Sequence, residues 1–134
     1  MELTIIFPVL NEKKRLESGV TRTVEYLQKI DFSDYEIIIV DNGSTDETPQ
    51  IAKSLCQKYR TVKFERINVR GVGAAFRRGV EVSCGEIVGY MDIDLSTNIK
   101  HLGEAIHIFE RNPEIEYING SRFARESDTK GRKW

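Results

Sequence analysis

The chain has 134 residues, with 20 Lys and Arg against 21 Asp and Glu, so its net charge is −1 with His counted neutral. Charged residues make up 31% and hydrophobic residues 40%, a balance that argues against disorder and against a general nucleic-acid binder. The length suits one compact domain with its own core. No run of about 18 apolar residues predicts a membrane span.

The first apolar run follows no basic segment and is cut at Pro8, so we expect no signal peptide and a cytoplasmic protein. Cys56 and Cys84 are the only cysteines, and both fall in stretches with helical patterning. Two isolated thiols do not make a Cys₄ metal site. We expect both to be reduced thiols in or near the core.

Five short apolar runs predict β-strands, at residues 3–7, 37–40, 62–66, 86–91 and 115–119. The second contains no polar residue, which is typical of a strand buried on both faces of a parallel sheet. Between the runs, apolar residues recur at helical spacing. They are Leu16, Val20, Val24 and Leu27; Ile51, Ala52, Leu55, Cys56 and Tyr59; and Leu102, Ala105, Ile106 and Phe109. This alternation predicts an α/β fold with a mostly parallel sheet and helices on both faces.

Two other features bear on the helices. Ser44 precedes Glu47 by three residues, the spacing of a capping box before the helix that carries Ile51. Asp46 either contacts a ligand or caps a helix. The stretch from 70 to 85 is compatible with a helix, although its glycines loosen the pattern. Its G-x-G lacks a third glycine and does not follow the first strand, which argues against a dinucleotide site. The arginines at 70, 77 and 78 either reach a phosphate or lie on an exposed helix surface.

Polar residues follow three of the predicted strands. They lie at 8–12 (Pro-Val-Leu-Asn-Glu), 41–46 (Asp-Asn-Gly-Ser-Thr-Asp) and 91–96 (Met-Asp-Ile-Asp-Leu-Ser). Ligands of open α/β sheets bind where the carboxyl ends of the strands meet. Because carboxylates gathered there repel one another, we expect them to hold a cation or to accept hydrogen bonds from hydroxyl and base N–H groups.

Asp92 and Asp94 are the strongest candidates for a functional pair, since a spacing of two on an extended segment puts both side chains on one side. One carboxylate would bind Mg²⁺ or Mn²⁺, with a diphosphate completing the shell, and the other would reach a sugar hydroxyl. A solvated acidic turn is the alternative. Asp41 either contacts a ligand or closes an Asp-Asn-Gly turn, and Asn11 and Glu12 either lie near the ligand or simply begin the first helix.

Four segments together resemble the N-terminal, nucleotide-binding half of inverting family 2 glycosyltransferases, which have the GT-A fold. They are FPVLNE at 7–12, EIIIVDNGSTDET at 36–48, RGVGAAFRRGVEVSCGEIVGYMDIDLST at 70–97 and NGSRF at 119–123. Within that family, the dolichol- and polyprenyl-phosphate sugar synthases are the most similar. The resemblance covers nearly the whole chain.

The resemblance implies a role for each matching residue. Asp41 would recognise the base, Asp94 would be the main metal ligand, and Arg122 would lie near the donor phosphates. The nucleotide-binding positions are Pro8, Asn11, Glu12, Asp41 and Asp92, and Asp92 would also contact the metal. The chain departs from the pattern at Asn42, where many members carry a second Asp, and at Ser96, where lipid-phosphate synthases often carry Gln.

The implied activity is transfer of a sugar from a UDP- or GDP-sugar to an acceptor such as a polyprenyl or dolichyl phosphate, in cell-wall or glycan biosynthesis. The implied mechanism is an inverting displacement assisted by Mg²⁺ or Mn²⁺. One alternative is a sugar nucleotidyltransferase, although its glycine-rich loop would follow the first strand. The other is a non-catalytic nucleotide-binding domain of the same fold.

The polar stretch from 124 to 134 ends without a stop pattern, so we interpret residues 1–134 as a single GT-A domain truncated at its C-terminus. We expect any general base to lie beyond residue 134. We also expect the missing part to associate with the cytoplasmic face of a membrane. The isolated piece is then expected to be inactive and to self-associate through uncovered apolar surface.

Overall fold

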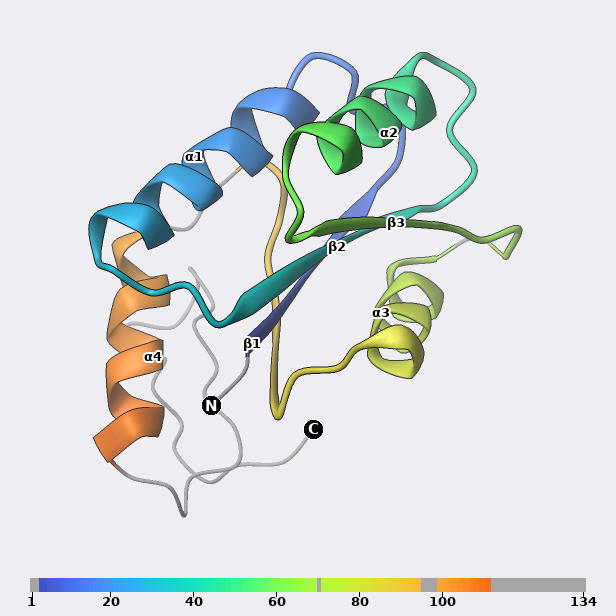
Figure 1. The fold of residues 1–134 in the computed structure, drawn as a ribbon. Helices are drawn as coiled ribbons and strands as arrows, with labels where there is room; N and C mark the ends of the chain where they lie inside the picture. Colours follow the sequence, from blue (N-terminus) through green and yellow to red (C-terminus); the bar gives the residue numbers. More distant parts are fainter. Residues whose placement is uncertain (1–2, 70, 95–98, 112–134) are drawn as a thin grey trace. The chain divides into compact units, whose positions relative to one another are not determined.

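The computed structural model describes residues 3–69, 71–94 and 99–111. The strands are β1 (Leu3–Val9), β2 (Tyr35–Asp41), β3 (Val62–Arg66) and β4 (Ile87–Tyr90). The helices are α1 (Leu16–Lys29), α2 (Thr48–Lys58), α3 (Val72–Val82) and α4 (Lys100–Arg111). The chain divides into two compact units, Met1–Asp94, which holds the sheet and the first three helices, and Leu95–Trp134, which holds α4 (Figure 1).

The four strands form a parallel sheet in the order β3-β2-β1-β4. All seven residues of β2 are buried, and so are all those of β1 except the half-buried Pro8. This confirms the α/β parallel fold and the strand predicted at 62–66. The strand predicted at 115–119 lies outside the described residues.

Helices cover both faces of the sheet within the first unit, as predicted. Figure 1 shows α1 and α2 on one face and α3 on the other. The apolar stripe predicted for α1 is buried along its whole length. On the other face, Ile38 and Val40 of β2 pack with Ile6 of β1 against Ala75 of α3. Since strand side chains alternate, Asp41 points to the face of α1 and α2.

Two local predictions are wrong. No side chain caps α2 at Glu47, because Ser44 is engaged elsewhere. Asp46 Oδ1 accepts a hydrogen bond from the Thr48 N–H at 2.9 Å, so its carboxylate lies at the start of α2 although Asp46 is not the N-cap residue. Cys84 lies beyond the end of α3 and is exposed, so it is not a core thiol. Cys56 is half-buried, and burial raises the pKa of its thiol.

A buried carboxylate ties the strands together at their amino ends. Glu36 of β2 accepts hydrogen bonds of 2.6 Å from the Thr4 hydroxyl, the Lys63 ammonium and the Cys84 N–H. Burial alone would raise the pKa of Glu36, but the hydrogen bonds from Cys84, Lys63 and Thr4 outweigh burial and hold that pKa below its ordinary value. This cluster joins β1, β2, β3 and the segment before β4, at the edge opposite the predicted site.

The approach of α3 to the sheet depends on Gly79. A Cβ at this position would lie 2.6 Å from Ile6 Cδ1, closer than packed carbon atoms come. We therefore expect Gly79→Ala to lower the free energy of unfolding by about 1–3 kcal/mol, measured by chemical denaturation, even though Ala favours the helix. Gly73→Ala is the matched control in the same helix, because its Cβ would meet no atom within 4 Å. Equal stability of the two variants would contradict the close approach.

Candidate functional site

The loop after β1 is docked on the loop after β2 by hydrogen bonds. The Asn11 N–H donates to Ser44 Oγ at 2.8 Å, and Asn11 Oδ1 accepts from the Thr45 N–H at 2.9 Å. Asn11 has a φ of 52°, which Asn tolerates better than most residues. The Glu12 N–H donates to Thr48 Oγ1 at 2.9 Å. The strand ends predicted to meet therefore do meet, and Glu12 also lies at the entry to α1, as the alternative interpretation expected.

Asp41, the last residue of β2, is completely buried and already has partners within the protein. Its carboxylate accepts hydrogen bonds from the Ser44 hydroxyl and from the Ser44 N–H, the latter at 3.3 Å. It also pairs with Arg66 Nε at 3.3 Å, and Arg66 Nη2 donates to the Ser44 carbonyl at 2.9 Å. Gly43, with a φ of 95°, closes the turn that the sequence predicted as an alternative role for Asp41.

Asn42 holds an acceptor with unmet hydrogen-bonding capacity. The residue is 8% exposed, and its Oδ1 is buried without a hydrogen bond from any of the described residues. Leaving a buried acceptor unsatisfied costs about 1–3 kcal/mol, so native proteins rarely do so without a reason. An atom of this kind, directly after Asp41 at the carboxyl edge, is suited to a donor group on a ligand.

The segment with Asp92 and Asp94 differs in shape from the prediction. β4 ends at Tyr90 and the chain turns at Ile93 and Asp94, so the segment is not extended. Both carboxylates are nevertheless exposed, while Ile93 between them is 3% exposed. Burial and the charge of Asp92 together raise the pKa of the Tyr90 phenol.

Arg15 links this segment to the loop after β1. Its Nε lies 2.9 Å from Glu12 Oε1, and its Nη1 lies 3.7 Å from Asp94 Oδ2. The structure thus joins Asn11 to Asp41 through Ser44, and Glu12 to Asp94 through Arg15. Arg122 lies outside the described residues.

Metal ligands are sparse among the residues that the structure describes. No three His, Cys, Asp or Glu side chains in these ranges group closely enough to hold an ion. The exposed carboxylates of Asp92 and Asp94 nevertheless suit Mg²⁺ or Mn²⁺, which proteins usually bind through one or two carboxylates together with substrate phosphates. The chemistry of this donor set therefore fits the predicted metal.

Several residues of the site escaped sequence reasoning. Arg66 ends the third strand, and the rule that selected the other three strand ends would have found it. Ser44 was assigned to a helix cap instead of to Asp41. Nothing in the local sequence marks Arg15 as a partner of Asp94, because 79 positions separate them.

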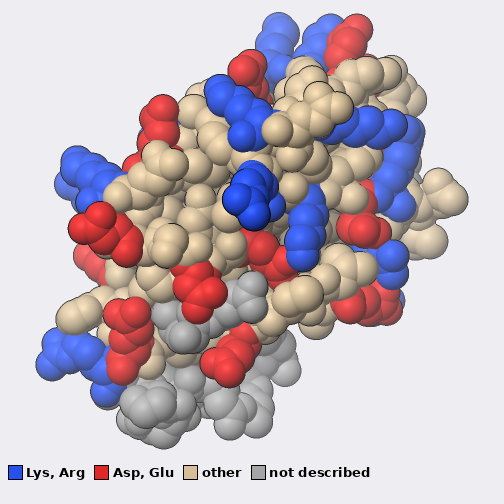
Figure 2. All heavy atoms as spheres, in the orientation of Figure 1, with Lys and Arg blue, Asp and Glu red and all other residues tan. Residues whose placement is uncertain are grey.

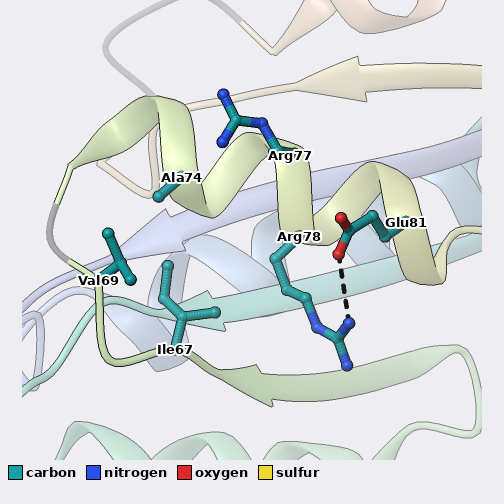
Figure 3. Close-up of a pocket in the computed structure, with 6 residues that line it drawn as sticks. All are labelled: Ile67, Val69, Ala74, Arg77, Arg78 and Glu81. Carbon is teal, nitrogen blue, oxygen red and sulfur yellow. Dashed lines mark hydrogen bonds and ion pairs between the residues drawn. The ribbon is translucent and has the colours of Figure 1, made fainter.

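A cavity of about 160 Å³ beside α3 is lined by Ile67, Val69, Ala74, Arg77, Arg78 and Glu81 (Figure 3). Arg78 pairs with Glu65 at 3.0 Å and with Glu81 at 3.3 Å, so it acts in the structure as a helix-surface residue. Arg77 is directed to the other side of the helix in Figure 3. Basic and acidic side chains are interspersed on the face shown in Figure 2.

Known proteins resemble the chain in sequence and in structure. It is 39% identical to dolichyl-phosphate beta-glucosyltransferase of Mus musculus over 96% of its own length and 43% of that protein. A structure of S. aureus TarS 1-349 in complex with UDP superposes with a TM-score of 0.67 at 26% identity, covering 84% of this chain and 33% of the TarS 1-349 chain. Glucosyl-3-phosphoglycerate synthase from Mycobacterium tuberculosis, in complex with Mn²⁺, UDP and glucosyl-3-phosphoglycerate, superposes with a TM-score of 0.53 at 27% identity. The match covers 68% of this chain and 33% of that structure's chain.

The chain spans 20–44% of the length of the curated relatives that it matches. Among the helices that the structure describes, none is both long and apolar enough to cross a membrane. The family model described as Glycosyl transferase family 2 matches residues 4–134, nearly the whole chain. Together with the parallel sheet and the polar groups at its carboxyl edge, this match shows that the chain belongs to glycosyltransferase family 2.

Proposed function

We propose that this chain forms the donor-binding part of an enzyme that moves a sugar from a UDP- or GDP-sugar to a polyprenyl or dolichyl phosphate. The observation that carries the proposal is the meeting of three strand ends in one hydrogen-bonded and ion-paired network. Asn11 and Ser44 connect to Asp41, and Glu12 and Arg15 connect to Asp94. Carboxylates, a buried acceptor and arginines lie together there, which suits a ligand with a base, hydroxyls and a diphosphate.

The base and ribose would bind beside β1 and β2. Asn42 Oδ1 would accept a hydrogen bond from a base N–H or a ribose hydroxyl, a partner that the described protein does not supply. Asp41 would recognise the base while Arg66 and Ser44 hold its carboxylate in place. Pro8, Asn11 and Glu12 would line the first loop of this nucleotide site.

Asp94, together with Asp92, would hold Mg²⁺ or Mn²⁺. When bound, the cation neutralises charge on the diphosphate leaving group, which lowers the barrier to departure. Asp92 would also reach the ribose, and Arg122, predicted from the sequence, would contact the phosphates. These residues bind and orient the donor so that the anomeric carbon faces the acceptor.

The acceptor assignment draws on the mouse relative, which is named for dolichyl phosphate. A lipid phosphate is already an anionic nucleophile, so a single inverting displacement needs no general base to activate it. Such an acceptor would place the full protein at the cytoplasmic face of a membrane.

The transferase activity is tested with the full-length protein in vesicles that contain dolichyl phosphate. We expect a radiolabelled glycolipid to form from UDP-glucose or GDP-mannose when Mn²⁺ or Mg²⁺ is present. The double variant Asp92→Asn/Asp94→Asn is the matched inactive control. If the protein binds the nucleotide but yields neither glycolipid nor free sugar from either donor, it is a non-catalytic domain and the proposal fails.

Asn42 provides a test of the base site. Asn42→Leu keeps the size of the side chain and removes the unsatisfied acceptor, so the free energy of unfolding should stay the same or rise. Binding of UDP or GDP, measured by calorimetry, should weaken about two- to tenfold, the value of one hydrogen bond. Asn42→Asp keeps an acceptor and should bind like the wild type. Unchanged affinity of the Leu variant would remove Asn42 from the site.

Asp94 and Asp92 are expected to differ in their dependence on metal. In Asp94→Asn, binding of the nucleoside diphosphate should no longer respond to Mn²⁺ or Mg²⁺, because the main charged ligand is lost. In Asp92→Asn, the affinity for the nucleoside diphosphate should fall even in the presence of EDTA, because a ribose contact is lost. Titrations of UDP with and without metal distinguish the two variants. Full metal dependence in Asp94→Asn would show that the assignment is wrong.

A further inference from the structure

Arg15 occupies a position that helix stability does not explain. It directly precedes α1, in the N-cap position, and its side chain makes no capping hydrogen bond. The N-terminus of a helix carries partial positive charge, so a cation there is disfavoured. The guanidinium turns instead to two carboxylates, Glu12 at 2.9 Å and Asp94 at 3.7 Å.

The same side of α1 also supports the chain next to Asp94. Gly19 lies one helical turn after Arg15, so the two positions share a face. A Cβ at Gly19 would come within 2.8 Å of Ile93 Cδ1 and closer still to the Ile93 carbonyl oxygen. The first turns of α1 thus hold both the backbone at Ile93 and the carboxylate of Asp94.

We propose that Arg15 is a positioning residue that neutralises Asp94 before the metal binds and then yields Asp94 to the divalent cation. This inference rests on the proposed function, in which Asp94 is a metal ligand. Without Arg15, the carboxylates of Glu12 and Asp94, which now share one guanidinium, would have less compensating charge. With Arg15 in place, the Asp94 carboxylate is held in position, but the cation must compete with the guanidinium for it.

The strength of the ion pair makes such an exchange feasible. The Arg15 and Asp94 side chains are 57% and 40% exposed, so their attraction is weak and screened by salt. Glu12 is only 20% exposed and keeps a shorter contact with the same guanidinium. Arg15 therefore gives up one partner and retains the other, and the change is confined to the Nη1 end of the guanidinium.

The test measures Mn²⁺ binding to the full-length protein without nucleotide, by electron paramagnetic resonance. We expect Arg15→Gln to bind Mn²⁺ about two- to fivefold more tightly than the wild type, and the gain to shrink as salt rises. Arg15→Lys keeps the charge and should stay close to the wild type. Lys13→Gln is the matched control. It also removes one positive charge, two residues from Arg15, but the Lys13 ammonium pairs with Glu47 at 3.3 Å.

The direction of the change separates the proposal from a purely structural role. If Arg15 only orders the segment, Arg15→Gln weakens Mn²⁺ binding, and the proposal is overturned. Unchanged affinity, or equal tightening in Arg15→Lys or Lys13→Gln, overturns it as well. If Asp94→Asn abolishes Mn²⁺ binding while Arg15→Gln has no effect, only the exchange is wrong. If Asp94→Asn binds Mn²⁺ normally, the metal site of the proposed function fails too.

Discussion

The parallel pairing of β1 with β2 is the constraint on which the rest of the molecule depends. The two strands run in register over seven residues, from Leu3 opposite Tyr35 to Val9 opposite Asp41. Helices cover both of their faces, so a shift of one residue would carry the buried side chains to the wrong faces. The polar residues begin where this pairing ends. Asn11 and Ser44 therefore meet because the buried strands before them have no other stable alignment.

Three of the acidic groups described at that edge, Asp41, Glu12 and Asp94, have an arginine beside them. Arg66 pairs with Asp41, and Arg15 pairs with both Glu12 and Asp94. A guanidinium stays charged and offers several donors in one plane, so it can bind a carboxylate and keep N–H groups free for another acceptor. In the proposed function, a diphosphate at this edge would meet carboxylates that are already paired with arginines, and this pairing lowers the repulsion between the carboxylates and the diphosphate.

Sequence patterns predicted the fold well because burial leaves a clear periodicity. The strand at 62–66 and the buried stripe of α1 follow directly from apolar spacing. The rule that ligand-binding residues gather at the carboxyl ends of the strands likewise predicted that Asn11 lies near Asp41. Local spacing failed where a tertiary contact decided the outcome. Ser44 has the sequence position of a helix cap, but its hydroxyl donates to the carboxylate of Asp41, a buried charged group that is costly to leave short of hydrogen bonds.

The segment at Asp92 and Asp94 shows a second kind of limit. Period-two spacing assumes an extended chain, and the turn at Ile93 ends that extension. Both carboxylates are exposed because Ile93 is drawn inward against Gly19, a contact between residues 74 positions apart. No pattern in a single sequence reports such a contact. The same holds for Arg15, whose role depends on what α1 faces.

The two halves of the site differ in how firmly they are held, and this difference has a chemical consequence. Asp41 is buried with several partners, and removing any one of them leaves a charged group short of hydrogen bonds, which is costly. Asp94 is part of a half-exposed ion pair that can exchange partners at little cost. A base that is recognised by shape and hydrogen bonding benefits from a rigid edge. A cation that binds and dissociates together with the diphosphate needs a protein ligand that can release it. In the proposed function, the buried and exposed carboxylates along one sheet edge would meet both requirements.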